Sequence, residues 1–205
     1  MNIYVVALSL MAGYLALNIR PANAADGGGL FIEPGVTYER GNGKLDLPSP
    51  FDDDKADVNG FGAMARVGFH ISEAFFVAAD GRYSRPTVDN DDYKADATAY
   101  NYGLTAGVQM PTTLGIRLWG TWVAGGELDP EKDENLDLKF KGANGYRLGG
   151  GIKLGIVSLN LEYQQLKYSD AELQKLGPFT VGENLDDTDA TNDSWIASVS
   201  FPFSL

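Results

Sequence analysis

The last twelve residues, SWIASVSFPFSL at positions 194–205, decide the fold of this chain. Five large apolar side chains of this segment share one parity, namely Trp195, Val199, Phe201, Phe203 and Leu205. Because successive side chains of a β-strand point to opposite faces, a strand formed here presents one continuous apolar stripe. Such a stripe requires an apolar environment along the whole length of the strand.

Seven earlier segments show the same alternation of apolar and polar residues. The predicted strands therefore cover about 30–40, 58–71, 75–85, 97–110, 116–125, 139–153, 156–168 and 194–205. Most of these segments reach the roughly 9–11 residues that a tilted transmembrane strand needs. An even number of such strands predicts an all-β fold: an eight-stranded antiparallel up-and-down transmembrane β-barrel without exposed edges.

The connections between these strands alternate in length. The long ones cover 41–57, 86–96, 126–138 and 169–193, and the short ones cover 72–74, 111–115 and 154–155. Long extracellular loops and short periplasmic turns are typical of outer-membrane barrels, and this pattern places both termini in the periplasm. A soluble eight-stranded ligand carrier would turn its apolar stripe inward and would show no such alternation. A β-sandwich with aromatic residues in its core remains an alternative.

Aromatic residues lie near both ends of the predicted strands, on the apolar parity. The predicted girdle consists of Tyr38, Tyr83, Tyr100, Tyr102, Trp122, Tyr146, Tyr163 and Trp195 near the long loops, and of Phe201 and Phe203 near the opposite rim. Aromatic belts at two levels mark the interfaces between lipid and water. This pattern favours a membrane barrel whose apolar stripes face outward.

The N-terminal segment has the pattern of a secretory signal. Residues 3–17 are mostly apolar, and the small-x-small sequence Ala22-Asn23-Ala24 follows them. This pattern predicts a cleaved signal peptide at residues 1–24, a flexible leader at 25–29 and the barrel at 30–205. No basic residue precedes the apolar run, so a retained inner-membrane anchor is the alternative. The chain has no cysteine, which excludes a disulfide framework.

Acidic residues are concentrated in the long connections. The chain has 28 Asp and Glu and 16 Lys and Arg, and the four long connections hold 22 of the acidic and 5 of the basic residues. We therefore expect acidic surface loops, and nucleic acid is not expected as a partner. Carboxylate oxygens suit Ca²⁺ or Mg²⁺, and such an ion could bridge the loops to lipopolysaccharide phosphates. The alternatives are an extracellular protein partner and loops that are simply solvated.

Charged side chains also occur on the polar parity, which faces the lumen of a barrel. The predicted lumen charges are Glu33, Arg66, Asp80, Arg82, Arg117, Arg147, Lys153 and Glu162. An unpaired charge in a lumen with little water is costly, so these groups should pair. Paired charges would close the narrow interior of an eight-stranded barrel, whereas an exchange of partners would make a narrow gated pore for small solutes or ions.

The expected turns set the register of two hairpins that carry these charges. A turn centred on Glu73 places Arg66 opposite Asp80. A two-residue turn at Leu154-Gly155 places Arg147 opposite Glu162. Each hairpin would then bring an arginine against a carboxylate inside the barrel, and opposite charges across a strand pair are stabilising.

An active site is not predicted. The chain has one histidine, His70, near the rim of short turns, whereas acyl-transfer chemistry usually requires a histidine beside a nucleophile. Zinc sites need Cys or several His ligands, which this chain lacks. We therefore expect no catalytic residue, no resident metal and no cofactor, and an envelope lipid-modifying enzyme is the alternative.

In these features the chain resembles the small eight-stranded outer-membrane barrel family, which includes the transmembrane domain of outer membrane protein A and the OmpX/Ail-type proteins. The resemblance rests on the predicted signal, the alternating segments, the charged lumen and the C-terminal strand. It implies a monomer in the Gram-negative outer membrane, surrounded by lipid and lipopolysaccharide. It also implies that the last strand, with Phe201 and Phe203, is read by the barrel-assembly machinery, although Leu205 replaces the usual terminal aromatic residue. The family's diverse roles imply a structural or interaction function carried by the loops.

Overall fold

A computed structural model describes residues 20–21, 28–46, 54–89, 94–110, 115–131, 136–176, 179–185 and 189–205. Most of these residues belong to β-strands. No helix in these ranges is long and apolar enough to cross a membrane.

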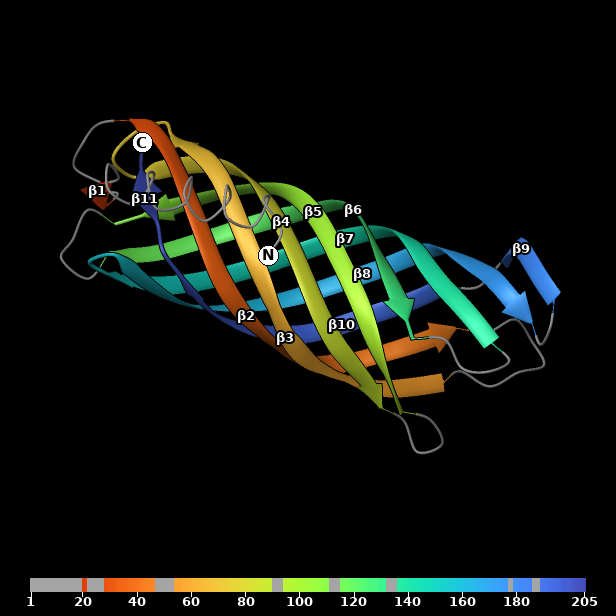
Figure 1. Cartoon of the computed structure of the whole chain (residues 1–205). Helices are drawn as coiled ribbons and strands as arrows, with labels where there is room; N and C mark the ends of the chain where they lie inside the picture. Colours follow the sequence, from red (N-terminus) through yellow and green to blue (C-terminus); the bar gives the residue numbers. More distant parts are fainter. Residues whose placement is uncertain are drawn as a thin grey trace, which may run out of the picture.

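Eight long antiparallel strands form the described part of the barrel (Figure 1). They are β2 (Gly29–Asp46), β3 (Asp54–His70), β4 (Phe75–Asp89), β5 (Lys94–Gln109), β6 (Ile116–Pro130), β7 (Leu136–Leu154), β8 (Val157–Leu176) and β10 (Asp189–Ser200). There are also three short strands, β1 (Arg20–Pro21), β9 (Phe179–Leu185) and β11 (Phe203–Ser204). Strand β9 pairs with β8, β11 pairs with β2, and β1 pairs with β11. Each long strand pairs with its sequence neighbour, and β2 pairs with both β3 and β10, so the sheet is closed. The predicted fold class is confirmed.

Burial alternates along each strand in the sense expected of a transmembrane barrel. In β4, for example, exposed Phe75, Val77 and Ala79 alternate with buried Phe76, Ala78 and Asp80. The exposed positions carry large apolar side chains such as Phe61, which is 75% exposed, while Arg66 on the same strand is fully buried. A soluble protein would reverse this arrangement, so the apolar outer face is the surface that contacts lipid.

The predicted girdle residues lie on this outer face. Those with large exposed fractions are Tyr38, Tyr83, Tyr100, Tyr102, Trp122, Tyr146 and Trp195. Tyr163 is half-buried because its ring packs against Trp195, with 5.4 Å between the ring centroids. Phe201 and Phe203 are also half-buried, and they flank the buried Pro202.

The register of one predicted hairpin is confirmed and that of the other is wrong. Arg66 pairs with Asp80 across β3 and β4, as expected. Across β7 and β8, however, Arg147 pairs with Gln164, and Glu162 pairs with Gly149. Leu154 pairs with Val157, so the turn residues are Gly155 and Ile156, one position later than predicted. Gly155 has a φ of +63°, a left-handed conformation that glycine adopts without strain.

The strands also continue beyond their predicted ends into the four long connections. Strands β7 and β8, for instance, remain paired as far as Leu136 and Leu176. Backbone ladders continue there although the apolar alternation has faded, because main-chain hydrogen bonds do not depend on side-chain polarity. In the predicted signal segment only Arg20–Pro21 is described, paired with Phe203 and Ser204, and its other residues lie outside the described ranges.

Candidate functional site in the barrel lumen

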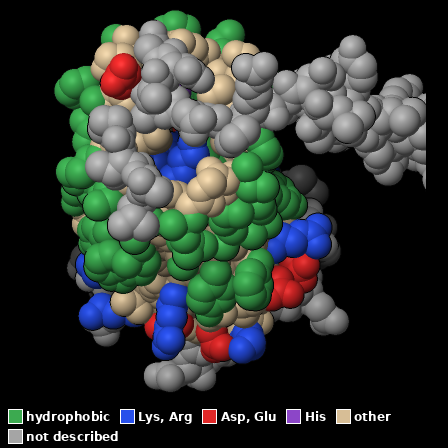
Figure 2. Space-filling view, turned by 90° about the vertical axis from the view of Figure 1, so that its left-hand side faces the viewer, with side chains coloured by type: hydrophobic (Ala, Val, Ile, Leu, Met, Phe, Trp, Pro, Cys, Tyr) green, Lys and Arg blue, Asp and Glu red, His purple; other side chains and the backbone are tan. Residues whose placement is uncertain are grey.

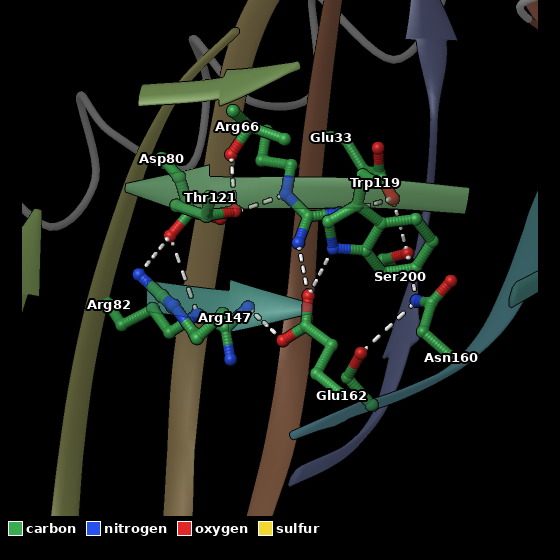
Figure 3. A network of polar contacts seen from close by, with 12 residues as sticks. Glu33, Arg66, Asp80, Arg82, Trp119, Thr121, Arg147, Asn160, Glu162 and Ser200 are labelled. Atoms are coloured by element: carbon green, nitrogen blue, oxygen red, sulfur yellow. Dashed lines mark hydrogen bonds and ion pairs between the residues drawn. The ribbon is translucent and has the colours of Figure 1, made fainter. Parts of the chain in front are cut away.

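The centre of the lumen is built around Arg66 of β3, which is fully buried. Its Nε donates to Asp80 of β4 at 2.8 Å, and its Nη2 donates to Glu162 of β8 at 2.5 Å. Its guanidinium carbon lies 4.7 Å from the ring centroid of Trp119 on β6, a cation–π geometry. Arg66 therefore connects strands on opposite walls of the barrel (Figure 3).

Two further arginines complete this central group. Arg82 of β4 donates to Asp80 at 3.4 Å and also bonds Glu162. Arg147 of β7 lies 2.9 Å from Asp80 Oδ1, the oxygen that Arg82 also contacts, and donates to Asn101 Oδ1 at 3.0 Å. Because β7 and β4 are not neighbours in the sheet, only closure of the barrel brings Arg147 to Asp80.

Glu33 and Arg117 form a second group toward the end of the barrel that carries the short turns and the C-terminus, here called the short-turn end. Both terminal nitrogens of Arg117 donate to the Glu33 carboxylate at 2.8 Å, a bidentate arrangement. Ser200 donates to the same carboxylate at 2.6 Å. Arg66 Nη1 lies 3.9 Å from Glu33, which links this pair to the central group.

Seven of the eight predicted lumen charges thus form one buried network, and Lys153 does not join it. The network residues are Glu33, Arg66, Asp80, Arg82, Arg117, Arg147 and Glu162, and they are at most 8% exposed. Lys153 also points inward and is 6% exposed, but within the described residues it makes no ion pair or hydrogen bond through its side chain. Several guanidinium nitrogens of the network have no hydrogen-bond partner in the described structure, including Arg82 Nη1 and Arg147 Nη1.

A third buried carboxylate group, at Glu39, was not predicted. Its Oε1 accepts hydrogen bonds from Ser194 at 2.6 Å, Asn192 at 2.8 Å and Gln164 at 3.2 Å. All three donors are neutral, so this carboxylate is held differently from those of the network. Glu39 has the same inward parity as Glu33, so the sequence pattern could have identified Glu39 as a lumen carboxylate.

The lumen toward the long connections, here called the long-loop end, holds an apolar group beside the Glu39 carboxylate. Buried side chains that pack together there are Val123, Phe140, Ala143, Leu166, Tyr168, Ala171 and Ala190. A second apolar group lies near the short-turn end and consists of Phe31, Phe76, Ala78 and Trp119. The interior of the barrel therefore holds apolar groups as well as the charged network.

His70 lies near the short-turn end, as predicted, and its ring packs between aromatic rings. The centroid of its imidazole is 4.8 Å from that of Phe31 and 6.0 Å from that of Phe76. Across the described ranges, no group of three or more His, Asp and Glu side chains is placed to hold a metal ion.

The long-loop end carries two further ion pairs, one exposed and one partly buried. Lys94 lies 2.6 Å from Asp89, and Lys139 lies 2.8 Å from Glu127. The hydrogen bond between Lys139 and Glu127 lowers the pKa of the Glu127 carboxyl and raises the pKa of the Lys139 amine. The segments 47–53, 90–93, 132–135 and 186–188, which hold many of the predicted loop acids, lie outside the described residues.

Comparison with known proteins gives matches in structure only. No protein-family model matches the chain, and no curated protein matches it by sequence. The outer membrane protein OprG from Pseudomonas aeruginosa is 13% identical, with 90% of this chain and 99% of OprG covered and a TM-score of 0.53. The attachment invasion locus protein Ail of Yersinia pestis is 14% identical, with 86% and 99% covered and a TM-score of 0.45. The likeness to OprG shows that this chain has the fold of an outer-membrane barrel.

Proposed function

We propose that this chain is an integral protein of the Gram-negative outer membrane with a non-enzymatic structural or interaction role. Two features support the location: the apolar outer face between aromatic girdles, and the fold shared with an outer membrane protein. The short-turn end, with both chain termini, then lies in the periplasm, and the long-loop end is extracellular. The chain acts as a monomer, and its last strand is recognised by the barrel-assembly machinery.

The lumen is closed, and the network around Arg66 carries this proposal. Its side chains come from strands on both sides of the barrel and meet at distances of 2.5–3.4 Å with almost no exposure. An eight-stranded barrel has an interior just wide enough for side chains to fill. The two apolar groups add further packing at both ends of the lumen.

Planar-bilayer recording tests closure. The refolded wild-type protein should show no steady conductance, whereas Arg66→Ala should produce salt-dependent steps because it removes a fully buried side chain from the centre of the lumen, where it contacts Asp80, Glu162 and Trp119. The exposed variant Lys94→Ala is the matched control and should stay silent. Steady steps from the wild-type protein would refute the closed lumen.

A narrow gated pore is the second candidate, and the unpartnered guanidinium nitrogens favour it. Arg82 and Arg147 both contact Asp80 and each keeps a free N–H group, so either could change partners without leaving the network. Such exchange predicts brief openings whose frequency changes with voltage. Arg147→Met should abolish these openings if they arise from partner exchange.

The interaction role is carried by the acidic extracellular segments, above all 41–57 and 169–193. Their partner is an extracellular protein, or a divalent cation that bridges carboxylates to lipopolysaccharide phosphates. Deletion of residues 177–188 should reduce attachment of cells to their target or the barrier function of the envelope. Full retention of both phenotypes would count against this role, provided that a heat-dependent shift in gel mobility shows the variant to be folded.

A further inference from the structure

Basic side chains that the central network leaves unused converge on the short-turn end. The backbone N–H of Lys153 donates to the carbonyl oxygen of Gly115 at 3.2 Å, which places Lys153 opposite Gly115. Arg117 is two residues further along the same strand and pairs with Gly151. Lys153 and Arg117 are therefore diagonal neighbours on the inward face, within reach of one another for long side chains.

His70 approaches the same place from the other side of Phe76. The guanidinium of Arg117 lies 5.1 Å from the centroid of the Phe76 ring, and the His70 ring packs near the same phenyl group. Arg117 Nε and His70 Nδ1 are both buried and have no hydrogen-bond partner in the described part of the chain. Arg117 is only 1% exposed, so its free N–H cannot be satisfied by bulk water.

The charge at this place is not balanced by the described residues. The charged groups that act on Lys153 are Arg117 and Glu33. Glu33 is already held by both terminal nitrogens of Arg117 and by Ser200. The Lys153 ammonium is therefore a surplus positive charge beside another cation. Burial of such a charge is costly unless an anion accompanies it.

The space-filling view from this end shows a hollow with Lys or Arg side chains at its bottom (Figure 2). Basic side chains can therefore be seen from the short-turn end (Figure 2). We propose that this end of the barrel binds a small oxyanion, either a phosphate or a carboxylate group, through Lys153 and His70, beside the positive charge of Arg117. Ammonium, guanidinium and imidazole N–H groups are the donors that oxyanions accept most strongly, and the nearby Phe31 and Phe76 rings limit competition from water.

Titration of the refolded full chain with inorganic phosphate, and separately with acetate, tests this site by amide NMR. Saturable shifts should appear at His70, Gly115 and Lys153 and should be absent at the long-loop end. Lys153→Met keeps the apolar stem and removes the charge, so it should weaken binding at least tenfold, while Lys94→Met should leave it unchanged. Tighter binding of phosphate than of acetate would assign the site to phosphate groups, and the reverse would assign it to carboxylates.

Equal affinity in the wild-type protein and Lys153→Met, or no saturable shift with either anion, would overturn the proposal. A second measurement does not depend on that variant being folded. Crystals of the wild-type protein soaked in selenate should show an anomalous peak beside Lys153, and Lys153→Arg should retain it. A peak only at the long-loop end, or none, would also overturn the proposal.

Discussion

Two sets of ion pairs in this barrel have the same chemistry in opposite surroundings. Arg66 and Asp80 lie 2.8 Å apart with both side chains fully buried. Lys94 and Asp89 lie 2.6 Å apart at the long-loop end, with side chains 68% and 39% exposed. The shorter pair is the weaker one energetically, because water screens it and its side chains lose entropy on pairing. Burial, more than distance, decides how much the loss of one partner matters.

The largest expected effect comes from breaking the buried network at one carboxylate. Glu162→Leu removes one of the two carboxylates that Arg66 and Arg82 share, so Asp80 alone remains to both. It also removes the acceptor of the Trp119 N–H, a bond of 2.6 Å. Uncompensated buried charge typically costs about 3–5 kcal/mol, so the free energy of unfolding should fall by that amount. Urea unfolding in lipid vesicles measures it. A loss below about 1 kcal/mol would mean that the buried network contributes no more to stability than an exposed ion pair does.

Replacing both partners of the buried pair Glu33 and Arg117 tests whether the cost comes from the charge left unpaired. Glu33→Leu alone should destabilise the barrel by about 3 kcal/mol or more, because Arg117 loses both hydrogen bonds of its bidentate contact. Adding Arg117→Met should recover most of that loss, since an apolar pair needs no charge compensation. The double-mutant cycle is read from unfolding free energies. If the loss of unfolding free energy in the double variant equals the sum of the losses in the two single variants, Glu33 and Arg117 are not energetically coupled.

A smaller effect is expected at Glu39, whose donors are neutral. Glu39→Ala leaves Asn192, Gln164 and Ser194 with unpaired polar groups but no unpaired charge. The expected loss is about 1–3 kcal/mol, less than for Glu162→Leu. Both variants can be compared in one unfolding series, and a larger loss at Glu39 would reverse the proposed ranking.

The smallest effect is expected at the pair of Lys139 and Glu127, whose side chains are 21% and 25% exposed. Lys139→Met should change the unfolding free energy by less than about 1 kcal/mol, and added salt should reduce the difference. Because the hydrogen bond lowers the pKa of Glu127 in the folded state, the contribution is complete above the ordinary value of 4.5 and is lost as the pH falls through the lowered value. Unfolding measured between pH 7 and pH 3 checks this. A difference that grows on acidification would contradict the assigned pair.

Particular residues show how far the sequence could predict the candidate site. The eight charged residues chosen by inward parity are buried in the structure. The two-residue period of a strand assigns each side chain to a face, and this assignment does not depend on which strands are neighbours. The pairing of Arg147 with Glu162 was wrong, since a shift of the turn to Gly155 and Ile156 changes every partner across β7 and β8. The contact of Arg147 with Asp80 joins residues far apart in the chain, and no local pattern contains it.

The sequence by itself determined the strand number, the face of each side chain and the closed antiparallel order, because alternation and connection length are local properties. Only the tertiary structure decided which arginine meets which carboxylate, and that Lys153 meets none of them within the described residues. It also decided that an apolar group packs inside the barrel at the long-loop end. These features depend on how side chains from non-adjacent strands meet across the barrel axis. Barrel closure and strand register together determine these contacts, and the sequence of a single strand specifies neither closure nor register.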